Sequence, residues 1–112
     1  MSWFFKRSPS IQQVDPSEAW RRKQAQEAIV VDVRESGEWK SGHIPGARHI
    51  PLAQLKAQLP TLLSEKEVIF VCRSGARSAS ATAALAGAGH GRALNMSGGM
   101  VAWTRAGLPT KL

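Results

Sequence analysis

The chain has 112 residues, which is the size of one ordinary domain. Its composition is 43% hydrophobic and 21% charged with one cysteine, which excludes a disordered chain, a collagen repeat and a disulfide framework. The net charge of +7 is spread along the chain without a basic block, so we expect no nucleic-acid partner.

The N-terminal segment predicts a short tail followed by one domain. Residues 1–9 place aromatic side chains before a basic pair, which reverses the order of an export signal. The longest run without charged side chains, residues 78–91, is shorter than the ~20 apolar residues of a membrane-spanning helix. We therefore expect a tail over residues 1–9, a domain over residues 10–112, no membrane span and a cytoplasmic location.

The first half of the chain predicts helices and strands in alternation. Asp15 followed by Pro16 has the order of an N-cap and a first helical residue, which predicts a helix over residues 17–26. The β-branched run 29–33 predicts a strand covered on both faces, as in a parallel sheet. The next expected elements are a short helix over 35–40, a turn over 44–47, a strand over 48–50 and an amphipathic helix from 52 to about 60, with a further turn possible after Pro60.

The second half of the chain continues this alternation. A second β-branched strand is predicted over residues 68–71, and six alanines predict a helix with small side chains over 78–88. A short strand over 92–96 and a turn at Gly98 and Gly99 lead to a last helix that ends near residues 107–109. The order of elements predicts an α/β layer fold with a parallel sheet and right-handed crossovers.

Cys72 is the candidate for chemistry, because it directly follows a predicted strand and stands shortly before a helix. The amides of a helix N-terminus and two nearby arginines favour a thiolate, so we expect a lowered pKa for Cys72. No Asp or Glu occurs after Glu67, which also favours a small anion in this region. The alternative is that Cys72 is a small buried hydrophobe, although its basic and polar neighbours argue against an inert core position.

The residues after Cys72 are small or basic and suit a loop that holds an anion: Arg73, Ser74, Gly75, Ala76, Arg77 and Ser78. Two chemistries remain open, attack of the thiolate on phosphorus or on sulfur. Cysteine-dependent phosphatases have a similar loop with five residues between cysteine and arginine, whereas four separate Cys72 from Arg77. The loop length therefore favours sulfur.

Other polar residues have mainly structural interpretations. The three histidines and Cys72 have no zinc-binding spacing, so we expect no metal. Asp32 is expected to cap a loop, and His43 to fasten a turn. Arg34 stands at the end of a strand and is a candidate either for the same structural role or for a contact with the anion.

Four separated motifs resemble the rhodanese family in its single-domain form. Residues 31–35 with Glu38 and Trp39 resemble its strand-to-helix signature, and residues 42–47 with 50–51 resemble its second signature. Residues 72–78 resemble its six-residue active-site loop, and the glycines and tryptophan of residues 98–109 resemble its closing element. The resemblance extends from about Ile11 to Thr110.

The resemblance implies an α/β fold with a five-stranded parallel sheet flanked by helices on both faces. It also implies a sulfurtransferase without metal or organic cofactor, in which Cys72 attacks the outer sulfur of thiosulfate or a similar donor and becomes a persulfide. Cyanide or a thiol, including a thiol on a protein, then accepts the sulfur. Arg73 and Arg77 are expected to attract the anion by charge, and the loop amides of residues 73–78 to hold the persulfide.

Two alternatives come from other classes of function. One is a cysteine-dependent phosphatase or arsenate reductase that uses the same thiolate. The other is a non-enzymatic persulfide carrier or regulatory binding module. One departure from the family concerns His90, which stands where the family often has an aromatic core residue and predicts a looser connection into the last strand.

Overall fold

The structure is a computed structural model that describes residues 11–112. The tail predicted over residues 1–9 lies outside the described residues, and the boundary of the domain at residue 10 stays a prediction. None of the helices in the described part of the chain is long and apolar enough to cross a membrane.

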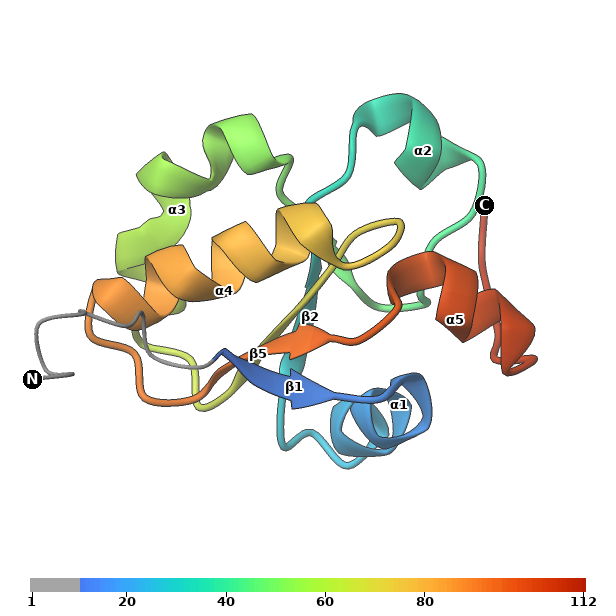
Figure 1. Cartoon of the computed structure of the whole chain (residues 1–112), viewed down its shortest axis with the longest axis horizontal. Helices are drawn as coiled ribbons and strands as arrows, with labels where there is room; N and C mark the ends of the chain where they lie inside the picture. The colour runs from blue at the N-terminus through green and yellow to red at the C-terminus, as the bar shows by residue number, and fades with distance from the viewer. Residues whose placement is uncertain (1–10) are drawn as a thin grey trace, which may run out of the picture.

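Five parallel strands form one sheet in the order β1-β5-β4-β2-β3 (Figure 1). Their bounds are β1 Gln12–Val14, β2 Ile29–Asp32, β3 Arg48–His49, β4 Val68–Val71 and β5 Ala93–Met96. The order places β4 at the centre, with β2 and β5 as its neighbours. The predicted α/β fold with a five-stranded parallel sheet is confirmed.

Five α-helices alternate with the strands along the chain, and the last of them follows β5. Their bounds are α1 Pro16–Gln24, α2 Ser36–Lys40, α3 Leu55–Leu62, α4 Ala76–Gly87 and α5 Gly99–Arg105, with a 3₁₀ turn over Leu52–Gln54 before α3. The Asp15 side chain accepts a hydrogen bond from the Glu18 N–H at 2.8 Å, as expected of an N-cap before Pro16.

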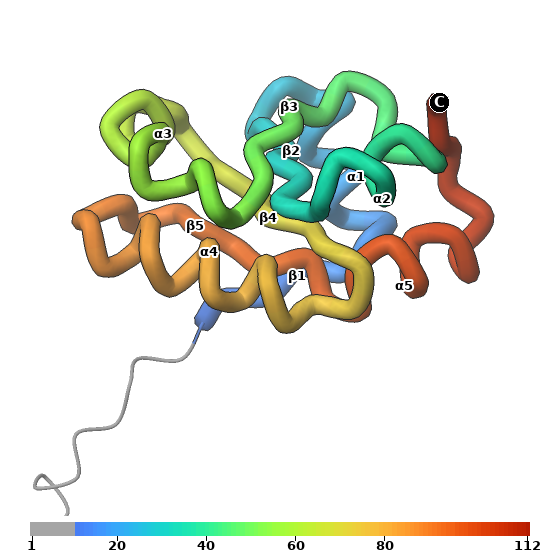
Figure 2. Tube along the Cα trace, turned by 90° about the horizontal axis from the view of Figure 1, so that it is seen from above, coloured from blue at the N-terminus to red at the C-terminus, as the bar shows by residue number. Residues whose placement is uncertain are grey.

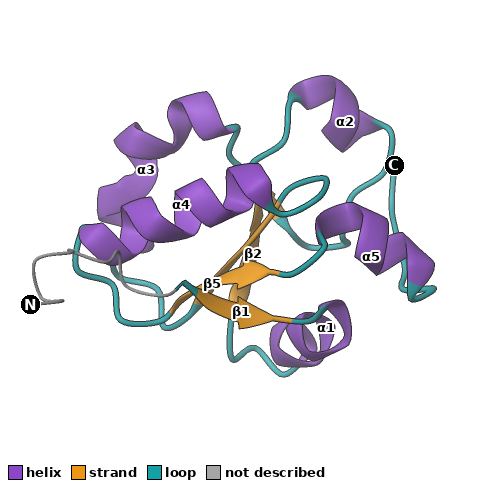
Figure 3. Cartoon of the chain, viewed as in Figure 1, coloured by secondary structure: helices purple, strands orange, loops and turns teal. Residues whose placement is uncertain are grey.

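Helices cover both faces of the sheet (Figure 3). Alternate residues of β4 point to opposite faces, so Ile69 packs in the cluster under α1 and α5, and Phe70 in the cluster under α3 and α4. Trp103 of α5 is fully buried on the first face, where its ring meets that of Trp20 edge to face at 5.6 Å. Two apolar layers therefore hold β4 and fix the position of the residue that follows it.

Most predicted bounds differ from the observed ones by a residue or two, and α5 ends at Arg105 rather than near residues 107–109. Helix α4 begins at Ala76, two residues before the predicted start, because the loop after β4 is tight. Pro60 lies inside α3, which continues to Leu62, so the further turn considered after Pro60 is present. Strand β1 was not predicted from its pattern, because it is three residues long and Gln12 and Gln13 are exposed.

His90 gives a well-fixed connection into β5, so the looser connection predicted there is wrong. His90 is 9% exposed, and its Nδ1 accepts a hydrogen bond from the Arg92 N–H at 2.9 Å. Its Nε2 then carries the proton and donates to the Glu65 carbonyl at 2.7 Å. Two hydrogen bonds replace the packing that an aromatic residue would supply.

Candidate active site

Cys72 lies directly after the central strand β4 and is 1% exposed. The chain turns through residues 73–75 into α4, and this loop lies between α2 and α5 (Figure 2). Ligands of open α/β sheets bind just beyond the carboxyl ends of the strands, which is where this loop lies. The sheet thus carries the one cysteine of the chain to the position that favours chemistry.

Hydrogen bonds favour the thiolate of Cys72. Burial raises the pKa of its thiol, but the Ser78 hydroxyl and the N–H groups of Ser78, Gly75 and Ser74 outweigh this effect and hold the pKa below its usual value. The Gly75 N–H donates to Cys72 Sγ at 3.1 Å, and the Ser78 hydroxyl donates at 3.2 Å. Ser78 is fully buried, so its hydroxyl does not exchange this partner for water.

Replacing Ser78 by alanine is expected to raise the pKa of Cys72, because one donor to the thiolate is lost while the burial is kept. The rate of alkylation by iodoacetamide, measured against pH, reports this pKa cleanly because the chain has one cysteine. The midpoint of the profile should move to higher pH. Ser80→Ala, on the exposed side of the same helix, is the matched control and should keep the native midpoint. Equal midpoints for Ser78→Ala and the native chain would contradict the assignment.

Gly75 permits the tight turn that aims an N–H at the sulfur. Its φ is +114°, a conformation that L side chains rarely adopt. Asn95 of β5 contacts the turn: its Nδ2 donates to the Gly75 carbonyl at 3.4 Å and to Gln13 Oε1 at 3.2 Å. Asn95 is 4% exposed, and sequence reasoning missed it because nothing in a short strand marks one polar residue as a support for a distant loop.

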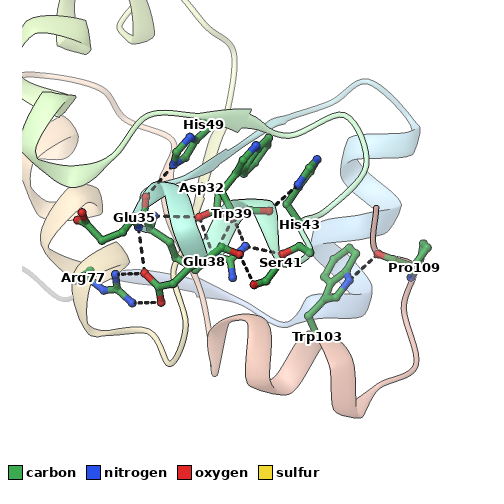
Figure 4. Close-up of polar contacts among 12 residues, drawn as sticks. Asp32, Glu35, Glu38, Trp39, Ser41, His43, His49, Arg77, Trp103 and Pro109 are labelled. Carbon is green, nitrogen blue, oxygen red and sulfur yellow. Dashed lines mark hydrogen bonds and ion pairs between the residues drawn. The ribbon is translucent and has the colours of Figure 1, made fainter. Parts of the chain in front are cut away.

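Arg77 is paired with Glu38 of α2. Two guanidinium nitrogens of Arg77 donate to the two carboxylate oxygens at 2.7 and 2.9 Å (Figure 4). This contact lowers the pKa of Glu38 to about 2, so both groups are ionised at neutral pH. Because Arg77 already shares its charge with the Glu38 carboxylate, this arrangement does not itself support a contact with a substrate anion. That contact stays a prediction. Glu38 was noted only as part of a motif, and its pairing with Arg77 was missed.

Helix α2 is also held by stacking. The ring of Trp39 lies between those of His43 and His49, nearly parallel to both, with centroids 3.6 and 4.7 Å away. His43 Nδ1 contacts the Trp39 carbonyl at 3.0 Å, and His49 Nε2 contacts the Arg34 carbonyl at 2.8 Å. His43 therefore fastens the turn after α2, in agreement with its structural interpretation, and the helix presents Glu38 in a fixed position.

Arg34 does not face the loop as a free cation. Its guanidinium donates to both carboxylate oxygens of Asp32, at 2.8 to 3.0 Å, and to the Gly42 carbonyl at 2.8 Å. Asp32 is fully buried and also accepts from the Arg34 N–H at 3.0 Å. Both residues thus cap the loop after β2, as expected for Asp32, and of the two candidate roles for Arg34 the structural one is observed.

The N-terminal end of α5 lies against the backbone of the active-site loop. The Met100 N–H donates to the Cys72 carbonyl at 2.8 Å, and the Val101 N–H donates to the Arg73 carbonyl at 3.1 Å. A Cβ at Gly99 would overlap both carbonyl groups, and Gly99 has a φ of +57°. Sequence reasoning saw only a turn here, because this glycine is required by a contact between distant segments.

The remaining loop residues, Arg73, Ser74 and Ala76, are exposed. Of the predicted residues 73–78, the structure brings groups of Ser74, Gly75 and Ser78 to the sulfur of Cys72, whereas Arg73 lies at the surface. Their roles toward a substrate stay predictions. Among residues 11–112, no three His, Cys, Asp or Glu side chains lie together as a group of metal ligands.

Comparison with known proteins agrees with this geometry. The family model described as "Rhodanese-like domain" matches residues 15–106. A relative named "Sulfurtransferase" from Allochromatium vinosum is 38% identical over 89 residues, which are 80% of this chain and 83% of the relative. A "Putative sulfurtransferase YtwF" from Bacillus subtilis is 40% identical over 70% of this chain and 75% of its own length.

Solved structures have the same fold. A thiosulfate sulfurtransferase from Pseudomonas aeruginosa superposes with a TM-score of 0.78 and 30% identity, over 94% of this chain and 20% of that one. A protein from Rhodopseudomonas palustris, described as of unknown function and a possible tyrosine phosphatase, superposes with a TM-score of 0.82 and 26% identity, over 90% of this chain and 85% of that one.

Proposed function

Because this chain belongs to the rhodanese-like domain family, we propose that it is a sulfurtransferase that carries the transferred sulfur as a persulfide on Cys72. The observation that supports this most is the environment of the sulfur atom. Cys72 Sγ is buried at the end of β4, accepts hydrogen bonds from Gly75 and Ser78, and has a lowered pKa. A thiolate that is already ionised needs no general base to act as a nucleophile.

The first half-reaction loads the sulfur. The Cys72 thiolate attacks the outer sulfur of thiosulfate or a similar donor, and a new S–S bond forms as the S–S bond of the donor breaks. Sulfite leaves with the electron pair of the broken bond. The loop N–H groups that now point at the thiolate then stabilise the negative charge of the persulfide.

Two arginines have different parts in this proposal. Arg73 is exposed and attracts the anionic donor to the loop by its charge. Arg77 holds the end of the loop through its two hydrogen bonds to Glu38, and any contact with the donor is made from this fixed position. Cyanide or a thiol takes the sulfur in the second half-reaction, which gives double-displacement kinetics.

Phosphatase or arsenate reductase activity is the second candidate, and the possible tyrosine phosphatase from Rhodopseudomonas palustris is the observation in its favour. The loop argues against it. Four residues separate Cys72 from Arg77, and the guanidinium of Arg77 is engaged by Glu38 rather than open to the three oxygens of a phosphoryl group. A "Putative sulfur carrier protein YrkF" among the relatives keeps a persulfide carrier as the non-enzymatic alternative.

Intact mass spectrometry after incubation with thiosulfate tests the proposal. We expect the native chain to gain one sulfur atom, and cyanide to remove it with formation of thiocyanate. Cys72→Ala should gain nothing under the same conditions. A folded native chain with a reactive thiol that gains no sulfur would rule out thiosulfate as donor, and hydrolysis of an aryl phosphate that is lost in Cys72→Ala would favour the phosphatase.

A further inference from the structure

The carboxylate of Glu38 lies at the end of the active-site loop, where it binds the guanidinium of Arg77 at 2.7 and 2.9 Å (Figure 4). Glu38 and Arg77 are 31% and 35% exposed, so the pair faces the solvent from which a sulfur donor arrives. We propose that Glu38 is a specificity-determining residue, which disfavours donors with two negative charges, such as thiosulfate, relative to donors with one. The inference rests on the proposed function, because it concerns the reaction that loads Cys72 with sulfur.

The negative charge of Glu38 is fixed in position. Its Oε1 also accepts a hydrogen bond from the Glu35 N–H at 3.0 Å, which caps the first turn of α2. Trp39, the next residue, is stacked between two histidine rings. The contact with Arg77 lowers the pKa of Glu38 to about 2, so the carboxylate is ionised at neutral pH. A donor that approaches the loop therefore meets a permanent negative charge beside Arg77.

Glu38 decides how much positive charge the loop offers to an anion. Arg34 offers none, because its guanidinium is paired with the buried carboxylate of Asp32. Arg73 is exposed and forms no salt bridge within residues 11–112. Among these three arginines, Arg73 alone therefore keeps its full charge, and loss of the Glu38 carboxylate would add the charge of Arg77.

The electrostatic field of this pair extends to the reacting sulfur. Glu38 raises the pKa of Arg77 most, and the charge of Cys72 raises it as well, so Arg77 and the thiolate interact. Glu35 contributes in the same way but less than Cys72. The outer sulfur of a donor must reach Cys72, and its anionic end then lies in the field of Arg77 and Glu38. Because the Coulomb energy is proportional to charge, the Glu38 carboxylate opposes a dianion more than a monoanion.

Thiosulfate and methanethiosulfonate form a matched pair of donors. In methanethiosulfonate a methyl group replaces one oxygen of thiosulfate, which removes one of its two negative charges and keeps the outer sulfur. The Cys72 thiolate attacks this sulfur in both donors, an S–S bond forms as that of the donor breaks, and sulfite or methanesulfinate leaves with the electron pair. Both reactions give the same Cys72 persulfide, so the gain of one sulfur atom, followed by intact mass, gives the second-order rate constant for each donor.

The test compares the ratio of the two rate constants, thiosulfate over methanethiosulfonate, among variants. Glu38→Gln removes the charge but keeps an oxygen that accepts hydrogen bonds from Arg77. We expect it to raise the ratio about threefold to fivefold, as one partly exposed charge interaction provides. Glu65→Gln is the matched control, because it breaks the exposed ion pair with Arg48 and changes the net charge of the chain equally. Glu65 lies before β4, whereas Cys72 follows it, so this variant should keep the native ratio.

Two further readouts separate a charge effect from a structural one. A loop loosened by Glu38→Gln would slow both donors, and a changed reactivity of Cys72 would act on both, so neither effect alters the ratio. Added salt screens charges, so the difference in ratio between Glu38→Gln and the native chain should shrink as the ionic strength rises. Glu35→Gln, which removes a weaker influence on Arg77, should raise the ratio by less than Glu38→Gln.

The inference and the proposed function fail in distinguishable ways. A native chain that gains sulfur from neither donor contradicts the proposed function, and the inference with it. A chain that loads from both donors, but has the same ratio in the native form, Glu38→Gln and Glu65→Gln, keeps the proposed function and overturns the role of Glu38. An equal rise of the ratio in Glu38→Gln and Glu65→Gln also overturns it, because the net charge of the chain would then be the cause.

Discussion

Replacing Gly99 by alanine is expected to lower the free energy of unfolding by about 3 kcal/mol, from the cost of a left-handed conformation plus that of an overpacked contact. The φ of +57° accounts for the first part. The second arises because a Cβ would overlap the carbonyl groups of Cys72 and Arg73, which are backbone atoms and cannot rotate away. The same displacement would move the loop, so loading of Cys72 with sulfur should fall as well.

Urea denaturation of the two glycine variants measures this effect. Gly87→Ala is the control, because Gly87 lies in α4 with helical backbone and nothing within 4 Å of an added Cβ. It should leave the stability unchanged or raise it by about 0.5–1 kcal/mol through helix propensity. A Gly99→Ala chain as stable as Gly87→Ala, with native loading by thiosulfate, would show that α5 does not support the loop in the way described.

Replacing Arg34 by methionine is expected to cost about 3–5 kcal/mol of unfolding free energy, the usual penalty for leaving one partner of a buried ion pair alone. The Asp32 side chain is fully buried and that of Arg34 is 7% exposed, so neither charge is solvated by water. The variant also loses the hydrogen bond to the Gly42 carbonyl. The loop that connects β2 to α2 should therefore become the least stable part of the domain.

Two comparisons separate this explanation from a loss of packing. Arg48→Met breaks the exposed pair of Arg48 and Glu65 and should cost no more than about 1 kcal/mol. The double variant Asp32→Asn with Arg34→Met removes the unpaired buried charge, and it should be more stable than Arg34→Met alone. A double variant with the summed loss of its two single variants would contradict a charge effect.

The sequence predicted most of the fold because its signals are local. Strand β4 ends at Val71, directly before Cys72, both in the prediction and in the structure, and the small residues after Cys72 indicate a tight loop. Cys72 was identified from its neighbours alone, and the lowered pKa expected from them is found, with hydrogen bonds rather than the arginines as its main cause. Strand β1 was not predicted, because an edge strand of three residues is too short to show an alternation of apolar and polar side chains.

The support of the loop could not be predicted, because it depends on residues far apart in the chain. Glu38 and Arg77 are 39 positions apart, and Asn95 lies 20 positions from Gly75. No periodicity or spacing connects such pairs, and each of these residues alone has an ordinary surface or strand interpretation. The sequence motif that contains Glu38 predicted only the fold of that segment. The three-dimensional structure shows that Glu38 pairs with Arg77.

The position of β5 has a consequence for biosynthesis. Cys72 is made before β5 and α5, yet β5 joins β1 to the rest of the sheet, and the amides of α5 bind the carbonyls of Cys72 and Arg73. A nascent chain on the ribosome that ends before residue 93 therefore contains Cys72 but lacks β5 and α5, which hold the loop in place. We expect the contacts that hold the loop around Cys72 to form only when β5 and α5, within residues 93–105, have left the ribosome and docked.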